Sequence, residues 1–271
     1  MSAALALEKA RTETLRARRN ASLFIWSARA LLAVAIIAGW ELGAGRVISV
    51  DTVSQPSAIV AAWLDLVRAG LLEQDLIVTL QEFLIGFVVG TAVGVIAGFV
   101  LTVRDVVYRM IEPYFLAIYG IPKIALAPLF ILWFGIGLLP KEVLVGILVF
   151  FLVLINTVAG VRSVKPEMLQ IVRVFGARGA VVHRVLILPH ALPIVLTAVR
   201  ASIPSGMLGA VLGEMLGGGR GLGYLLLQAT NYVNMAQTFA ILFTLAAMVL
   251  MFRLVLLPAE AWVARREMVE G

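Results

Sequence analysis

The sequence contains no cysteine and few charged residues. Without cysteine it has no disulfide framework, no thiolate metal site and no cysteine nucleophile. Charged residues make up 14% of the 271 residues and hydrophobic residues 62%, and the mean hydropathy is +1.02. Soluble domains are only about half apolar. The composition therefore indicates a protein whose solvent is the lipid bilayer.

Signatures of catalysis and of nucleic-acid binding are also lacking. The two histidines, His183 and His190, have no paired carboxylates and no metal-ligand spacing. The glycine-dense segment 217–223 lacks the Lys-Ser/Thr ending of a nucleotide-binding P-loop. The net charge is +6, but the basic residues lie between apolar runs, where they set topology and contact anionic lipid. We therefore expect no enzyme, no metal site and no nucleic-acid partner.

Long apolar runs dominate the rest of the sequence. Each is close to the roughly 20 residues that a bilayer-spanning helix requires, and the basic residues concentrate in the segments that lie inside if the N-terminus is inside. The sequence thus predicts an all-α polytopic membrane protein with about six transmembrane helices and both termini in the cytoplasm. The expected divisions are an N-terminal arm over 1–21, a membrane domain over 22–257 and a C-terminal tail over 258–271. The expected spans are Ser22–Ala44, Ile77–Val103, Met110–Phe134, Val143–Val161, Ala191–Leu216 and Ala236–Leu257.

Three features stand out in and between these spans. Gly86, Gly90, Gly94 and Gly98 recur every four residues, which predicts close approach of another helix, within the subunit or across a dimer interface. Arg46–Leu76 is expected to contain a short amphipathic surface helix. Glu214–Met235 is glycine-dense and is expected to form a re-entrant or gate-forming loop. In the third span Pro113, Pro122 and Pro128 are expected to kink the helix, either along a pathway or merely for packing.

The inside segment 164–190 is long, basic and partly apolar. Apolar residues recur at helical spacing up to Phe175, Gly176 interrupts them, and a second helical stretch from Ala180 is expected to stop at Pro189. A helix outside the bilayer is expected to bury its apolar face, either against the protein's own helix ends or in the groove of a partner. We therefore expect a helix, a sharp bend and a second helix.

This segment resembles the signature loop of type I ATP-binding-cassette (ABC) importer permeases. The family pattern is E-A-A, three residues, a glycine, nine residues and I-x-L-P. Gly176 and Leu188-Pro189 fall in register, Leu186 takes the isoleucine place, and Gln170, Ile171 and Val172 replace the E-A-A triplet. Further segments resemble the nitrate/sulfonate/taurine branch: GIPKIALAPLFILWFGIG at 120–137, LPHALPIVLTAVRASI at 188–203 and GEMLGGGRGLGYLL at 213–226.

The resemblance implies a permease subunit in the bacterial inner membrane that carries a small solute. It implies ABC ATPase subunits that bind ATP and magnesium, an extracytoplasmic substrate-binding protein, and a homodimer of permeases. The bent loop would dock on the ATPase, with the loop arginines pairing with partner acids or only enforcing topology. The residues implied for this coupling are Glu167, Gln170, Arg173, Gly176, Ala177, Arg178, Leu188 and Pro189.

Polar residues within the spans are candidates for the pathway, because a charge facing lipid costs about 2.5–3.5 kcal/mol. A Lys or Arg lining suits an anion such as nitrate, sulfonate or carboxylate. The negative charge of Glu82 argues against an anionic substrate, so an aromatic or pyrimidine-like substrate remains an alternative. A further alternative is that Glu82 forms a structural ion pair with Lys123 or Arg200. The candidates are Glu82, Lys123, Asn156, Arg200, Ser202 and Ser205.

The glycine-dense segment supplies candidates for an outer gate, namely Glu214, Gly221 and Gly223. Alternatively, Glu214 is a solvated carboxylate that pairs with Arg220. Two other function classes remain as alternatives: an ion-gradient-coupled transporter, which requires midplane carboxylates and paired broken helices, and a membrane scaffold without a pathway.

Overall fold

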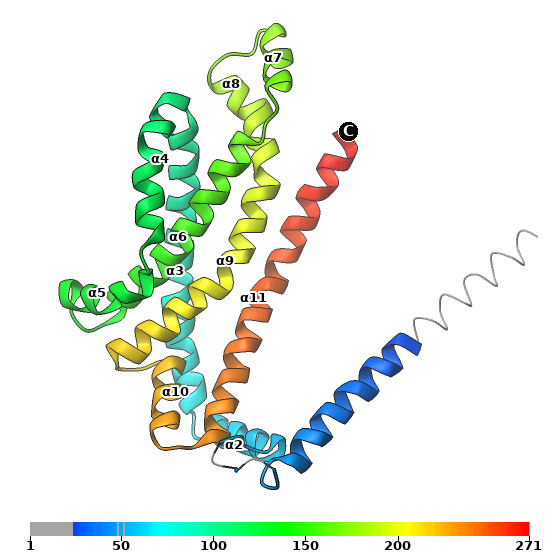
Figure 1. Cartoon of the computed structure of the whole chain (residues 1–271), viewed down its shortest axis with the longest axis vertical. Helices are drawn as coiled ribbons and strands as arrows, with labels where there is room; N and C mark the ends of the chain where they lie inside the picture. Colours follow the sequence, from blue (N-terminus) through cyan, green and yellow to red (C-terminus); the bar gives the residue numbers. More distant parts are fainter. Residues whose placement is uncertain (1–23, 48, 51, 271) are drawn as a thin grey trace, which may run out of the picture.

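The computed structural model describes residues 24–47, 49–50 and 52–270, with side chains up to residue 260. The regular elements in these ranges are helices, and most of them run roughly along one axis in a bundle (Figure 1). The expected arm over 1–21 lies outside the described residues. The expected tail begins within a helix, since α11 runs over Met235–Glu270 without a break at residue 258.

Within the described residues, five helices are long and apolar enough to cross a membrane, and the number is six if one bent helix pair is counted as a single span. This agrees with the predicted number of about six. The five are Phe24–Gly43, α3 (Leu71–Thr102), α6 (Leu138–Arg162), Ala180–Gly217 and the Met235–Glu260 part of α11.

The third span is broken rather than kinked. α4 (Asp105–Gly120) is followed by the 3-10 helix η1 (Lys123–Leu126) and by α5 (Ala127–Phe134), and the pair is bent by 78°. The break lies at Pro122, since proline disfavours helical geometry in the residue before it and Ile121 is extended, with ψ 132°. Pro113 lies inside unbroken α4 and Pro128 in the first turn of α5, so neither causes the break.

The centre of the bundle is the contact between α3 and α6. The glycine stripe of α3 faces α6 of the same subunit, so the close approach predicted from its spacing takes place within one chain. A Cβ atom on Gly86 would lie 2.5 Å from the carbonyl oxygen of Glu142, and one on Gly90 would overlap the carbonyl oxygen of Gly146. The two backbones are therefore packed as closely as glycine permits.

Two short helices lie at the end of the bundle opposite α7 (Figure 1). α2 (Pro56–Arg68) confirms the expected short amphipathic helix, and its Trp63 indole donates a hydrogen bond to Thr244 of α11 at 3.2 Å. α10 (Leu222–Asn231) packs against α9 (Leu188–Gly217) and α11. The segment expected to be re-entrant is thus a tight glycine turn followed by a helix.

The first helix, Phe24–Gly43, extends away from the other spans (Figure 1), and its apolar side chains are exposed, Phe24 to 73%. Among the described residues, its contacts with the bundle lie near its C-terminal end. Trp40 stacks edge-on against Phe239, with ring centroids 5.9 Å apart, and Glu41 accepts hydrogen bonds from the backbone and hydroxyl of Ser57. These contacts fix this end of the helix against α2 and α11.

Candidate coupling and translocation sites

The segment that joins α6 to α9 forms the expected helix, bend and second helix. α7 (Pro166–Val174) ends at a turn in which Gly176 has φ +89°, a backbone conformation that favours glycine. Leu169, Val172 and Ala177 pack against the span ends around Val161 and Ile187. The opposite face of α7 is not covered within the described chain: Ile171 is 56% exposed, Val174 84% and Phe175 86%.

The prediction that the second helix stops at Pro189 is wrong. α8 (Ala180–Val182) passes through the π-helix η2 (His183–Ile187) directly into α9, and Pro189 lies in the first turn of α9. The wider π-turn changes the hydrogen-bond register just before Pro189, so its missing N–H does not interrupt the helix. The segment is therefore joined to a span by continuous helix.

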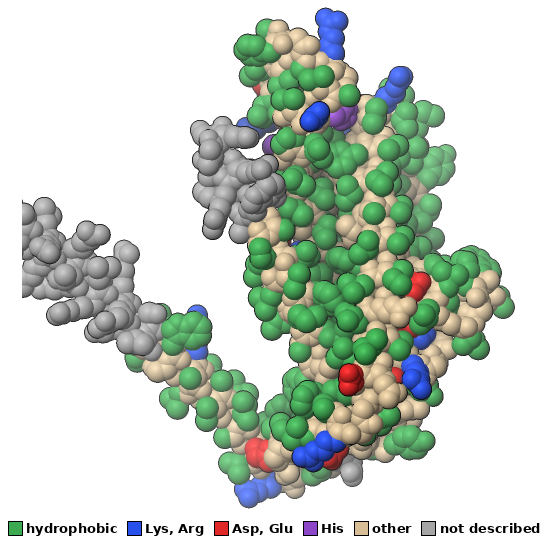
Figure 2. Space-filling model, turned by 180° about the vertical axis from the view of Figure 1, so that it is seen from behind, with side chains coloured by type: hydrophobic (Ala, Val, Ile, Leu, Met, Phe, Trp, Pro, Cys, Tyr) green, Lys and Arg blue, Asp and Glu red, His purple; other side chains and the backbone are tan. Residues whose placement is uncertain are grey.

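The other coupling candidates lie on the same projecting segment. Glu167, Gln170, Arg173 and Arg178 are exposed, whereas Ala177 is partly buried and Leu188 is 45% exposed. None of the candidate arginines has an ion-pair partner in the described part of the chain. On the face in Figure 2, hydrophobic side chains cover the middle of the molecule, and charged side chains gather toward its ends.

An ion pair is buried where α6 begins. Lys141 Nζ lies 2.9 Å from Glu82 Oε1, and the side chains are 4% and 0% exposed. The same ammonium donates to the carbonyl oxygen of Arg220 at 3.2 Å. Glu82 is thus enclosed within the subunit and neutralised there. Its predicted pairing with Lys123 or Arg200 is wrong.

Glu214 holds the corner between α9 and α10. It is 0% exposed and accepts hydrogen bonds from the Thr79 hydroxyl at 2.6 Å and from the Gly223 N–H at 2.5 Å. Gly221 has φ +123°, its N–H donates to Asp75, and a Cβ atom there would overlap the Glu214 carboxylate. The predicted alternative of a solvated Glu214 paired with Arg220 is wrong, because the Arg220 side chain donates to Gln74 instead.

The pathway candidates do not gather at one place. Arg200 pairs with Glu260 at 2.5 Å, Ser202 is buried and donates to the Val199 carbonyl, and Asn156 donates to the Leu152 carbonyl of its own helix. Ser205 is half-buried. Among the described residues, no hydrogen bond or ion pair joins two of the six candidates.

Lys123 lies at the break of the third span. Its Nζ donates to the Tyr119 carbonyl at 2.7 Å and lies over the rings of Tyr119 and Phe151, 4.2 and 4.9 Å from their centroids. No carboxylate pairs with it in the ranges that the structure describes. It is therefore a half-buried cation stabilised by a carbonyl dipole and two aromatic faces.

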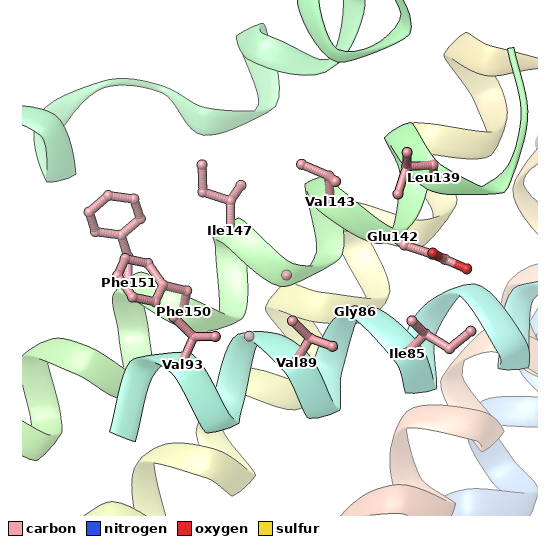
Figure 3. A pocket seen from close by; sticks show the side chains of 12 residues that line it. Ile85, Gly86, Val89, Val93, Leu139, Glu142, Val143, Ile147, Phe150 and Phe151 are labelled. Carbon is pink, nitrogen blue, oxygen red and sulfur yellow. The ribbon is translucent and has the colours of Figure 1, made fainter. Parts of the chain in front are cut away.

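Phe151 also lines a groove of about 610 Å³ between α3 and α6. Figure 3 shows Val89 and Val93 of α3 and Val143 and Ile147 of α6 facing it. The lining is apolar except for Glu142.

Sequence reasoning missed Lys141, Thr79 and Asp75. The expected span begins only at Val143, whereas α6 already begins at Leu138, so Lys141 enters the bundle. Thr79 and Asp75 lie one turn apart on α3, on the face that meets α9 and α10. Their spacing from Glu82 along one helix face was the available signal.

The comparisons with known proteins agree with this architecture. The family described as "Binding-protein-dependent transport system inner membrane component" matches residues 90–268. The chain belongs to this family. It is a permease subunit of an ABC importer, a transport subunit in the inner membrane, and the comparisons support this reading rather than the ion-gradient alternative.

Several relatives resemble the chain over most of its length. A Bacillus subtilis protein named as an aliphatic sulfonates transport permease is 30% identical, covering 88% of this chain and 87% of its own. The formylaminopyrimidine transport permease of Halalkalibacterium halodurans is 30% identical, covering 76% and 82%. The inward-facing methionine ABC transporter MetNI matches in fold, with a TM-score of 0.62 at 20% identity, covering 72% of this chain and 97% of that one.

Proposed function

We propose that this ABC permease docks ABC ATPase subunits through the Glu167–Pro189 segment and takes a small organic anion from an extracytoplasmic binding protein. In this proposal both termini and α7 lie in the cytoplasm, ATP and magnesium are bound by the ATPases, and two copies of the permease face each other across the pathway. The binding-protein-dependent family supports both kinds of partner.

The exposed apolar tip of α7 is the observation that carries the docking proposal. Val174 and Phe175 are 84% and 86% exposed at a helix end beyond the last turn of α6. Exposing large apolar side chains to water is unfavourable, and a partner's groove relieves that cost. Arg173 and Arg178 flank the tip and can pair with acidic side chains there.

The helix that follows links this tip to the spans. The turn at Gly176 sets the angle between α7 and the helix that follows. That helix runs unbroken over Ala180–Gly217 and ends at the Glu214 corner. A displacement imposed at α7 is therefore transmitted along one helix to the α9–α10 turn. We assign this turn, with Glu214, Gly221 and Gly223, as the outer gate.

The charges near the spans favour an organic anion. Glu82, which complicated an anionic substrate, is neutralised by Lys141 and buried. The amino group of Lys123 lies beside two aromatic rings and has no carboxylate partner among the described residues. The name of the Bacillus relative, which specifies aliphatic sulfonates, supports a sulfonate-type substrate.

Lys123→Met should then raise the KM for a sulfonate in proteoliposome uptake at least about tenfold. An unchanged KM would contradict a role for Lys123 in the pathway.

Phe175→Ser tests the docking proposal. The permease carrying an affinity tag is co-expressed with its ATPase, and the ratio of ATPase to permease is measured after purification. We expect the ratio to fall at least about tenfold, since truncation of a buried aromatic anchor costs about 2 kcal/mol or more.

Val106→Ser is the matched control. Val106 is 70% exposed in the first turn of α4 but lies outside the 164–190 segment. It should leave the ratio unchanged. Equal ATPase recovery for Phe175→Ser and the wild type would contradict docking at α7.

A further inference from the structure

A second cavity, of about 760 Å³, lies where the end of α3 meets the π-helix η2. It is separate from the α3–α6 groove, and although five of its lining residues lie within the 167–189 segment, none of them belongs to the exposed tip at Val174 and Phe175. A π-turn beside a cavity frequently marks a functional position in a helix. The lining residues are Phe99, Val100, Val103, Gly179, Ala180, His183, Arg184 and Leu188.

The lining is divided into an apolar part and a basic part. His183 and Arg184, on η2, are its only titratable residues, and the other six are apolar or glycine. Neither residue has a carboxylate partner in the part of the chain that the structure describes. The cavity therefore offers positive charge beside an apolar wall.

The apolar wall is fixed and open to the surroundings. Phe99 packs against the core cluster that contains Val182 and Ile187. Val100 and Val103 are 63% and 59% exposed, so a molecule at the surface of the bundle can reach the cavity. α3 ends at Thr102, so Phe99 and Val100 belong to the last turn of a span, and Arg184 lies near the start of the Ala180–Gly217 helix.

We propose that this cavity binds an anionic phospholipid. Arg184, assisted by His183, binds the phosphate, since guanidinium groups match phosphate oxygens in geometry and charge. An acyl chain covers Val100, Val103 and Leu188. A free phosphate ion satisfies the arginine but leaves the apolar wall exposed, so a lipid fits the whole cavity better.

The location gives the lipid a regulatory effect, which rests on the proposed docking of α7. η2 lies between α7, which carries the proposed docking tip, and α9. A lipid that ties η2 to the end of α3 restrains this link. ATPase activity coupled to transport should then depend on the anionic lipid content of the bilayer.

Native mass spectrometry of the permease complex measures the binding directly. The complex is released from nanodiscs containing equal amounts of phosphatidylglycerol and phosphatidylcholine, and the retained lipid is counted. We expect Arg184→Gln to lower the retained phosphatidylglycerol about fivefold, which corresponds to about 1 kcal/mol for one basic residue. Val100→Trp, which fills the cavity without removing charge, should lower it as well, and Arg184→Lys should restore most of it.

Arg253→Gln is the control, since Arg253 is exposed on α11 and does not line the cavity. Equal retention by Arg253→Gln, Arg184→Gln and the wild type would overturn the proposal. So would displacement of the lipid by millimolar inorganic phosphate, which would identify a phosphate site. Retained lipid is counted per permease subunit, with or without bound ATPase and without ATP turnover, so failure of ATPase docking leaves this measurement unaffected.

Discussion

The surroundings of the two ends of α6 differ in which side chains are buried and which are exposed. At its beginning, Lys141 and Glu82 are buried and paired, and Glu214 accepts two hydrogen bonds with none of its surface exposed. Beyond its end, Val174 and Phe175 are almost fully exposed. Charge is buried where the subunit contacts itself, and apolar surface is exposed where we propose that a partner binds. Stability and coupling are therefore assigned to different ends of one helix.

The largest expected effect is at the buried pair. Lys141→Met leaves Glu82 buried without its cation and should lower the free energy of unfolding by about 3–5 kcal/mol. Thermal unfolding of the permease in detergent measures this loss. The double variant Lys141→Met, Glu82→Met should recover much of it, because no uncompensated charge remains. A single variant as stable as the wild type would contradict the structural role of the pair.

The next effect is at the α3–α6 contact. Gly90→Ala places a methyl group against the Gly146 carbonyl and should lower the free energy of unfolding by about 1–3 kcal/mol. Gly39→Ala is the matched control, because no atom of another described helix lies within 4 Å of its Cβ position and alanine favours a helix. If both variants unfold at the same temperature, the close packing of α3 and α6 is wrong.

A smaller and more local effect is expected at the α9–α10 corner. Thr79→Val removes the hydroxyl that donates to Glu214 and accepts the Leu222 N–H at 2.8 Å. The cost should be about 1–3 kcal/mol, and hydrogen exchange should accelerate first at the start of α10. Thr197→Val, which removes an exposed hydroxyl on α9, should leave this exchange unchanged. Uniform acceleration across all spans would show that Thr79 does not act locally.

The smallest effect on stability is expected at α7. Phe175→Ser should change the free energy of unfolding by less than about 0.5 kcal/mol, since the side chain is 86% exposed. The same thermal unfolding experiment checks this value. A loss comparable to that of Gly90→Ala would mean that Phe175 belongs to the subunit core rather than to a docking surface.

The sequence was informative where the decisive interaction is local. The glycine stripe of α3, the amphipathic α2 and the bend at Gly176 all follow from spacing within one segment. Long-range pairing was not predictable. Glu82 and Lys141 are 59 residues apart, and the sequence favoured Lys123 or Arg200 as the partner of Glu82. Only the packing of α6 along α3 selects Lys141.

The positions of the prolines predicted helix breaks in some places and not in others, for a physical reason. Each proline removes one backbone donor, but the effect depends on whether that donor was needed. Pro122 lies at the break of the third span, whereas Pro189 is accommodated by the π-turn before it. The sequence does not reveal a π-turn, because its hydrogen bonds differ from those of an α-helix by one residue of register. The continuation of the helix from Ala180 past Pro189 is therefore not predictable from the sequence.

Coupling through the bend at Gly176 is tested by measuring transport-coupled ATPase activity in proteoliposomes with the binding protein present. Wild type is compared with Gly176→Asp, which places a side chain in a turn with φ +89° and a negative charge beside Arg173 and Arg178. We expect a variant that folds and inserts normally but loses the ATPase or hydrolyses ATP without transport. Normal association, hydrolysis and transport by Gly176→Asp would contradict it.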